Sequence, residues 1–299
     1  MSAAIPSHWR RQVPGCEADG QPLSVSPLGT GTAHQNWRVR TVVGEYVLRA
    51  PDPALPVMSQ RDFNREHSLQ QVASTQGIAP KIVRVDVQEL LLVMEFIDGE
   101  AWSCEDFSVA LRLRDLCARL IQLQHIEPPT LELFDPIRNA EVYAQQLLAQ
   151  DAADSHLIDV RLAAARRLWS ICCSDKRTAV ILHCDLHAGN VLDRQGVLGA
   201  DAIVLLDWEY AQIGDPLIDF AAICANYAKA LPPVMDWLSH HAPGGARLAA
   251  RLPLATAVFR LLSWLWYRVR ALQQQPRGDE LAQMSQLGED LDSALLVRV

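Results

Sequence analysis

Several protein classes are excluded by what this 299-residue chain lacks. Its opening stretch, MSAAIPSHWRRQVPG, has no apolar segment of the kind found in secretory signal peptides, and no run approaches the roughly 20 apolar residues of a membrane span. Basic residues are outnumbered: 27 Lys and Arg stand against 35 Asp and Glu, a formal net charge of −8. A dedicated nucleic-acid binder would show a basic excess. We therefore expect a cytoplasmic protein without nucleic-acid or membrane partners.

Cysteine pairs with metal-binding or redox spacing are also missing. The seven cysteines are scattered and odd in number, and none stands in a CxxC motif. This pattern fits reduced thiols in the cytoplasm better than a disulfide framework or a zinc site. Hydrophobic residues make up 49% of the chain, which is enough to bury a sizeable core in one large domain or two lobes.

The expected secondary structure changes character along the chain. The first hundred residues predict a hairpin around Gly44, a helix over 59–77 and strands over 81–87 and 90–97. Helical spacing follows over 103–124, 139–150 and 155–173, and again beyond Pro216. This order predicts an α+β fold of two lobes. A small β-rich lobe covers 1–97, a hinge lies near 95–101, and a larger, mostly helical lobe covers 98–299.

Two strings carry most of the functional signal. Residues 180–193 read VILHCDLHAGNVLD, and residues 204–220 read VLLDWEYAQIGDPLIDF. One apolar run is followed by Asp185 and, five residues later, Asn190, while the second apolar run ends in Asp207. Phosphoryl-transfer enzymes of the kinase type use an acid, an amide and a second acid in this order to activate a hydroxyl and hold metal. The strings therefore predict a kinase-like phosphotransferase.

Each of these polar residues has an expected role and a plainer alternative. Asp185 is the candidate catalytic base, because a carboxylate near the acceptor can orient the hydroxyl and take its proton. Asn190 and Asp207 are candidate magnesium ligands, since this hard cation prefers oxygen donors. Alternatively, Asp185 and Asn190 could simply cap turns. His183 and His187 are expected to brace the loop around Asp185, the alternative being a zinc site.

Candidate phosphate contacts come earlier in the chain. Glycine-rich loops can cradle phosphates through backbone N–H groups. In kinases, a basic residue on the following strand contacts the phosphates and pairs with a helix glutamate. Here Arg49 stands where lysine is usual, and Glu66 lies in the following helix; the alternative for this pair is a surface ion pair. The expected phosphate loop, which could instead be an ordinary hairpin turn, consists of Gly29, Thr30, Gly31 and Thr32.

With these motifs in view, the chain resembles the aminoglycoside phosphotransferase and choline kinase superfamily. The resemblance spans roughly 25–275 and rests on the pattern His183-x-Asp185-Leu-His187-x-x-Asn190 and on the string LLDWEYA with the later GDPLID. Within the superfamily, the HAGN and LLDWEYA strings and the RAPDP segment at Arg49 are most similar to bacterial thiamine kinases and choline-kinase-like proteins.

The resemblance implies a two-lobed protein-kinase-like fold that uses ATP and Mg²⁺. It implies Asp185 as base, Asn190 and Asp207 on magnesium, Arg49 on the phosphates and Glu66 as its partner. Asp215 and Asp219 are expected to brace the helix after the second string. The phosphate loop departs from the family pattern, because it is short and not a full GxGxxG. The expected adenine-contacting hinge consists of Met94, Glu95, Phe96 and Ile97.

The phosphate acceptor is the most open question. Choline-type kinases hold a cationic head group between aromatic rings, whose faces attract ammonium groups. Candidates here are Tyr210, directly after the second string, and Trp264 with Tyr267, which share a helix face. Glu209 could add to cation recognition or contact the metal. The alternative for the aromatic residues is core packing.

The sequence thus predicts an ATP- and Mg²⁺-dependent kinase acting on a small cationic alcohol, with thiamine favoured narrowly over choline. Two alternatives stay open. One is a kinase for aminoglycosides or amino sugars, and the other is a non-catalytic nucleotide-binding protein of kinase fold.

Overall fold

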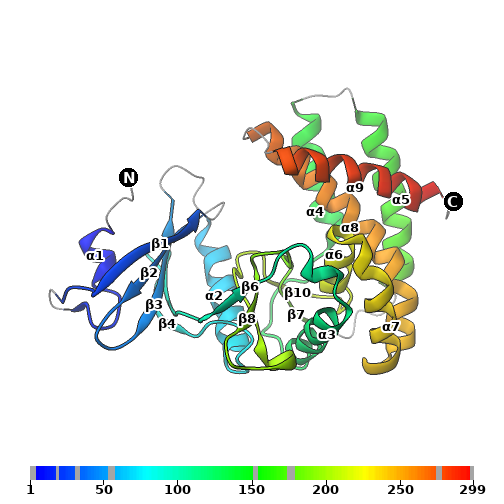
Figure 1. Ribbon diagram of the computed structural model, residues 1–299. Helices are drawn as coiled ribbons and strands as arrows, with labels where there is room; N and C mark the ends of the chain where they lie inside the picture. The colour runs from blue at the N-terminus through cyan, green and yellow to red at the C-terminus, as the bar shows by residue number, and fades with distance from the viewer. Residues whose placement is uncertain are drawn as a thin grey trace. The chain divides into compact units, whose positions relative to one another are not determined.

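The computed structural model describes residues 5–17, 20–30, 34–52, 58–150, 154–173, 179–273 and 278–296. Two compact units are present (Figure 1). The first, here called the N-terminal unit, comprises Met1–Ala101 and Gly189–Ala211, and the second, the helical unit, comprises Trp102–Ala188 and Gln212–Val299. The sequence prediction has one boundary, at 97/98, whereas the N-terminal unit also takes in 98–101 and 189–211. Asp185 therefore belongs to one unit, and Asn190 and Asp207 belong to the other.

An antiparallel five-stranded sheet forms the centre of the N-terminal unit, in the order β1-β2-β3-β5-β4 (Figure 1). Side chains alternate between its faces. Leu91 and Val93 pack in a buried cluster with Val13 and Trp37, whereas Leu92 packs with Phe63 of α2 in a second cluster. The elements are α1 (Ser7–Arg10), β1 (Ser24–Thr30), β2 (His34–Arg40), β3 (Glu45–Pro51), α2 (Gln60–Ser74), β4 (Ile82–Asp86) and β5 (Leu91–Glu95).

The local signals of this region are confirmed. The hairpin around Gly44 joins β2 to β3, with the Thr41 N–H donating to the Gly44 carbonyl at 2.8 Å. Ser59 caps α2 by accepting the Asp62 N–H at 3.1 Å. Gly77, expected to stop this helix, has φ +65°, a conformation that costs glycine little.

A second, three-stranded sheet of the N-terminal unit joins segments far apart in sequence. Its order is β6 (Gly99–Ala101), β8 (Val191–Arg194), β9 (Ile203–Leu205), and both pairings are antiparallel. Strand β8 is missing from the sequence prediction, which has only a link between the two strings. It begins directly after Asn190, so its pairing in the sheet fixes the position of this residue.

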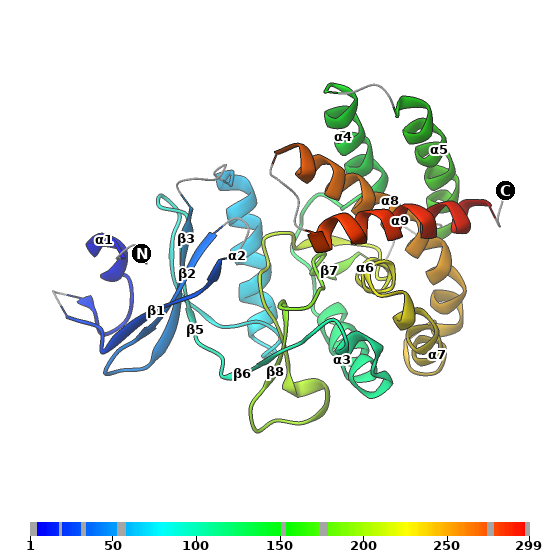
Figure 2. The same cartoon turned by 45° about the horizontal axis from the view of Figure 1, so that its top comes forward.

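The helical unit is built around α8, a 29-residue helix that packs against α4, α5, α6, α7 and α9 (Figure 2). Its one two-stranded sheet pairs β7 with β10, antiparallel, among the described residues. The elements are α3 (Ala110–Gln124), α4 (Pro136–Leu148), α5 (Ser155–Cys172), β7 (Val180–Leu182), β10 (Gln212–Gly214), α6 (Ile218–Asn226), α7 (Leu231–His241), α8 (Gly245–Gln273) and α9 (Gly278–Leu296).

The first long helix begins later than predicted. Helical spacing predicts a start at Ser103, but α3 starts at Ala110 after a short 3-10 turn over Asp106–Ser108. Asp106 explains the difference, because its carboxylate accepts hydrogen bonds from both the N–H and the hydroxyl of Ser103, at 2.7 and 2.9 Å. Such local side-chain bonds compete with helix formation.

By length and composition, part of α8 qualifies as a membrane-spanning segment. Gly245–Leu272 meets these criteria among the described residues. However, 61% of its most apolar window is buried inside the fold, and the core helix of a folded domain meets the same criteria. The apolar residues of α8 therefore have an evident role as the core of the helical unit.

Candidate active site

In the helical unit, the segment after β7 is held by a buried carboxylate. Asp219 of α6 accepts the backbone N–H groups of His183 and Cys184 at 2.9 and 2.8 Å. Burial raises the pKa of Asp219, while these two N–H donors act in the opposite direction. Asp219 lies in the first turn of α6, where the sequence expectation places an acid, and its carboxylate also braces the segment that leads to Asp185.

Asp185 itself is accessible. Its side chain is 30% exposed, and its backbone N–H donates to Nδ1 of the buried His183 at 3.3 Å. His187 Nε2 lies 3.4 Å from the Asp185 carboxylate. Within the described part of the chain, no three His, Cys, Asp or Glu side chains gather into a possible metal cluster. His183 accepts the Asp185 N–H, and His187 Nδ1 lies 2.6 Å from the Ala188 carbonyl, contacts that suit a braced loop.

A tyrosine overlooked by the sequence reasoning holds the far end of this segment. The Tyr227 hydroxyl, just after α6, accepts the Ala188 N–H at 2.8 Å. Its ring stacks on Phe107, with centroids 4.0 Å apart and planes 6° apart. Burial raises the pKa of Tyr227 well above its usual value. No motif marks Tyr227; only the fold brings it to Ala188.

Asp215 braces a different contact. One carboxylate oxygen accepts the Leu217 N–H at 2.9 Å, next to the start of α6, as the sequence predicts. The other pairs with Arg251 of α8 at 2.5 Å. The segment before α6 is therefore fixed to the central helix of the unit.

The candidate metal ligands lie together in the N-terminal unit. Asn190 precedes β8 and Asp207 follows β9, and the carbonyl of Asn190 accepts the Leu206 N–H at 2.8 Å. Asp207 is exposed, whereas the next residue, Trp208, is fully buried and donates its indole N–H to Leu205 at 2.9 Å. The buried indole anchors the backbone beside the exposed carboxylate.

Left-handed backbone marks both predicted strings. Cys184 has φ 64° and Asp207 has φ 60°. Outside glycine, Leu90 is the only other residue with positive φ in the described ranges. Such conformations cost free energy and gather at functional sites. Their positions, beside Asp185 and at Asp207 itself, therefore support these two segments as parts of a functional site.

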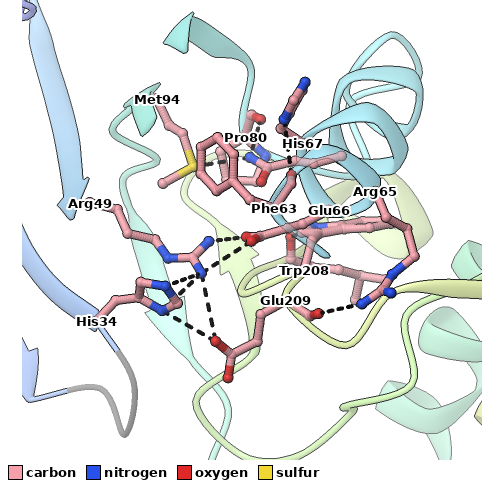
Figure 3. A network of polar contacts seen from close by, with 12 residues as sticks. His34, Arg49, Phe63, Arg65, Glu66, His67, Pro80, Met94, Trp208 and Glu209 are labelled. Atoms are coloured by element: carbon pink, nitrogen blue, oxygen red, sulfur yellow. Dashed lines mark hydrogen bonds and ion pairs between the residues drawn. The ribbon is translucent and has the colours of Figure 1, made fainter. Parts of the chain in front are cut away.

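Arg49 and Glu66 form a buried pair rather than a surface one. The guanidinium donates from both terminal nitrogens to the Glu66 carboxylate, and the two residues are 5% and 0% exposed (Figure 3). Burial lowers the pKa of Arg49, while the nearby Asp207 and Glu209 carboxylates act to raise it. Arginine stays protonated in proteins, so the unit holds a buried positive charge facing the second string.

Glu209, a candidate substrate contact, is directed at this pair. Its carboxylate lies 3.2 Å from His34 Nδ1 and 3.6 Å from an Arg49 nitrogen, and the residue is 8% exposed (Figure 3). Arg65 of α2 donates to the carbonyls of Glu209 and Ala211, at 3.5 and 3.0 Å. In contrast, the neighbouring Tyr210 is 41% exposed.

The other candidate nucleotide-binding residues are only partly described. Gly29 and Thr30 end β1, whereas Gly31 and Thr32 lie outside the described residues. In the predicted hinge, the Glu95 and Phe96 N–H groups donate to Lys81 and Glu45, both at 3.0 Å. Met94 Sδ accepts from Gln70, and Ile97 is partly buried. An adenine contact through the Glu95 and Phe96 N–H groups would therefore have to displace a bond of the fold.

Two of the aromatic candidates share α8 but differ in surroundings. Trp264 is 6% exposed, and the guanidinium carbons of Arg161 and Arg268 lie 4.4 and 4.8 Å from its ring centroid. Arginine already takes the place that a substrate ammonium would need. Tyr267 is partly exposed, and its ring contacts that of Trp266. A cavity of about 380 Å³ is lined by Trp264, Arg268, Met284, Ser285, Gly288 and Glu289.

Comparison with known proteins finds similarity to phosphotransferases and small-molecule kinases. A family model described as "Phosphotransferase enzyme family" matches residues 24–251. No curated protein sequence matches the chain. Among solved structures, a choline/ethanolamine kinase family protein from Mesorhizobium loti is 19% identical with a TM-score of 0.74, covering 97% of this chain and 93% of its own.

Two further structures show the same fold. Choline kinase LicA from Streptococcus pneumoniae is 18% identical with a TM-score of 0.70, covering 91% of this chain and 94% of its own. A thermostable variant of aminoglycoside phosphotransferase APH(4)-Ia is 16% identical with a TM-score of 0.66, covering 98% and 99%. LicA is also known with AMP, and a variant of APH(4)-Ia with ADP and hygromycin B. The predicted two-lobed, protein-kinase-like α+β fold is confirmed.

Proposed function

Because this chain belongs to the phosphotransferase enzyme family, we propose that it transfers a phosphoryl group from ATP to the hydroxyl of a small cationic alcohol. The observation that carries the proposal is the composition of the N-terminal unit. Here a buried, charge-paired arginine shares one unit with an amide and an exposed carboxylate at the ends of two adjacent strands. Positive charge and oxygen donors are what a nucleotide triphosphate and its metal require.

The residues present fit magnesium. Asn190 and Asp207 offer amide and carboxylate oxygens, the donors this hard cation takes, whereas protein zinc sites include cysteine or histidine ligands. We assign these two side chains to the metal and Arg49 to the α- and β-phosphates, with Glu66 as its partner. Bound magnesium would neutralise charge on the phosphates.

Asp185 is the proposed base. Its carboxylate is partly exposed, so an acceptor hydroxyl can reach it, and the backbone around it is fixed by Asp219 and His183. A base held in this way orients the hydroxyl and accepts its proton as the phosphoryl group is transferred.

A cationic acceptor is supported by the aromatic side chains of the helical unit. Tyr227 and Tyr267 are partly exposed, and Tyr227 bonds directly to the segment that carries Asp185. Aromatic faces attract ammonium and thiazolium groups. Thiamine, with a ring cation and a primary alcohol, stays narrowly favoured over choline because of the HAGN and LLDWEYA strings. We do not assign Trp264 to the acceptor, because arginines cover it.

The decisive experiment is an ATP-consumption screen of the purified protein with Mg²⁺ over thiamine, choline, ethanolamine, amino sugars and aminoglycosides. We expect turnover with thiamine or another small cationic alcohol, confirmed by mass spectrometry of the phosphorylated product. Exclusive turnover of aminoglycosides or amino sugars would replace the proposed substrate class. ATP binding without transfer to any acceptor would favour a non-catalytic role. The Asp185→Ala variant is the control, since ATP consumption that persists in it does not come from the proposed transfer reaction.

A further inference from the structure

His34 is the first residue of β2 and is buried against the candidate phosphate-binding arginine. It is 8% exposed, and both of its ring nitrogens lie near the same Arg49 nitrogen, Nδ1 at 2.9 Å and Nε2 at 3.1 Å (Figure 3). Nδ1 also lies 3.2 Å from Glu209. No motif assigns this histidine a role, yet it touches two members of the buried network.

The partners of His34 define a bridge between Arg49 and Glu209. A carboxylate only accepts hydrogen bonds and a guanidinium only donates them. A neutral imidazole satisfies both when Nδ1–H donates to Glu209 and Nε2 accepts from Arg49; this tautomer is assigned from the network. Arg49 and Glu209 are themselves 3.6 Å apart, beyond hydrogen-bond distance. His34 therefore adds hydrogen bonds to an ion pair whose own atoms lie too far apart for one.

An arginine at position 49 needs such a link more than a lysine would. The guanidinium is a rigid planar fork whose direction decides which oxygens it can reach, whereas an ammonium is a point charge with rotatable donors. Glu66 engages both terminal nitrogens of Arg49, and His34 bonds to one of them from β2. Contacts from two different elements leave the plane of the fork little freedom to rotate.

We propose that His34 is a positioning residue that fixes the Arg49 guanidinium in the orientation that receives the nucleotide phosphates. This inference rests on the proposed function, because it takes Arg49 as a phosphate contact. It goes further by assigning a part to a histidine outside both strings. It also explains why arginine can serve where lysine is usual.

A double-mutant cycle tests this role. His34→Phe keeps a ring but removes both nitrogens, and His34→Gln restores one donor and one acceptor. Each is made with Arg49 and with Arg49→Lys, and the dissociation constant of Mg·ADP is measured by calorimetry. With Arg49, we expect His34→Phe to weaken binding by about tenfold and His34→Gln to recover most of it. In the Arg49→Lys background, His34→Phe should change binding by less than about twofold.

The possible outcomes distinguish a failure of the role proposed for His34 from a failure of the role proposed for Arg49. Equal weakening by His34→Phe in both backgrounds would show a merely structural role and overturn the proposal. Unchanged Mg·ADP binding in Arg49→Ala would instead remove Arg49 from the phosphates, and with it this part of the proposed function. His67→Gln is the matched control, since this histidine of α2 bonds to the Phe63 carbonyl within its own helix. We expect no change in nucleotide binding there.

Discussion

The two units hold their candidate functional groups by different means. In the N-terminal unit, the Arg49 charge is held by opposite charges, because it lies between Glu66 and the His34–Glu209 pair. All four side chains are nearly excluded from solvent. In the helical unit, the backbone around Asp185 is held by Asp219 and Tyr227, while the Asp185 carboxylate stays partly exposed. A group that must hold a polyanion is stabilised by counter-charges, whereas a base must keep its own oxygens accessible. The Arg49 side chain is therefore fixed through counter-charges, whereas the hydrogen bonds to Asp219 and Tyr227 fix the backbone around Asp185.

The largest expected effect comes from removing the accessible carboxylate. Asp185→Ala should lower kcat by about 10²- to 10⁴-fold, the usual contribution of general base catalysis. The melting temperature should stay nearly unchanged, because the backbone bonds to Asp219 persist and the lost side chain is partly exposed. Steady-state kinetics with the acceptor from the screen, together with a thermal melt, measure both. Retained turnover would remove Asp185 from the mechanism.

Next in size is a break in the buried charge network. Glu66→Gln keeps the shape of the side chain but leaves Arg49 without its main counter-charge. We expect the free energy of unfolding to fall by about 3 kcal/mol, since breaking a buried pair strands a charge. Urea denaturation measures this change.

An exposed ion pair provides the control for that substitution. Glu141 pairs with Arg166 at 2.7 Å, with side chains 38% and 51% exposed. Glu141→Gln should cost no more than about 0.5 kcal/mol. Similar losses in Glu66→Gln and Glu141→Gln would mean that burial does not set the strength of the network.

The same contrast explains what the sequence could predict. Asp185, Asn190 and Asp207 each follow an apolar run at a fixed spacing, so they can be read from local pattern. Arg49 and Glu66 follow from a strand and a helix that lie next to each other in the chain. Both sets come from short segments whose geometry neighbouring residues determine.

Other parts of the site depend on pairings that local pattern does not contain. Apolar and polar residues alternate over 37–43, so the strand that this pattern predicts leaves His34 out; only the register of β2 against β3 places His34 in the sheet. Strand β8 is four residues long and forms by pairing with β6, which lies far earlier in the chain. Helical spacing puts Trp264 and Tyr267 on one face, but it cannot reveal that arginines cover Trp264.

A smaller effect is expected at the carboxylate that braces the loop. Asp219→Asn replaces one acceptor oxygen by an amide that cannot accept the N–H of His183 or Cys184. A buried donor left without its acceptor costs about 2 kcal/mol. We expect a lower unfolding free energy together with a lower kcat, because the backbone around Asp185 is no longer fixed.

The control for Asp219 is an exposed acid in the same unit. Asp236 of α7 has a side chain that is 79% exposed. Asp236→Asn should leave both stability and kcat unchanged within error. If Asp219→Asn lowered stability but kept full kcat, the loop would not need this brace to work.

The smallest expected effect is at Tyr227, where only the hydrogen bonds of one neutral hydroxyl are removed. Tyr227→Phe leaves the stack on Phe107 in place but takes away the acceptor of the Ala188 N–H. The unfolding free energy should drop by about 1 kcal/mol, and kcat should fall a few-fold.

The kinetics of Tyr227→Phe also separate two roles for this residue. A brace acts through the loop and lowers kcat while the KM for the alcohol stays constant, whereas a substrate contact raises that KM. Tyr46→Phe provides the control, since this hydroxyl lies over Gly44 in the β2–β3 turn and should affect neither constant. A raised KM with unchanged kcat would instead assign Tyr227 to the binding of the acceptor alcohol. In that case the helical unit, like the N-terminal unit, would hold its ligand through side chains directly.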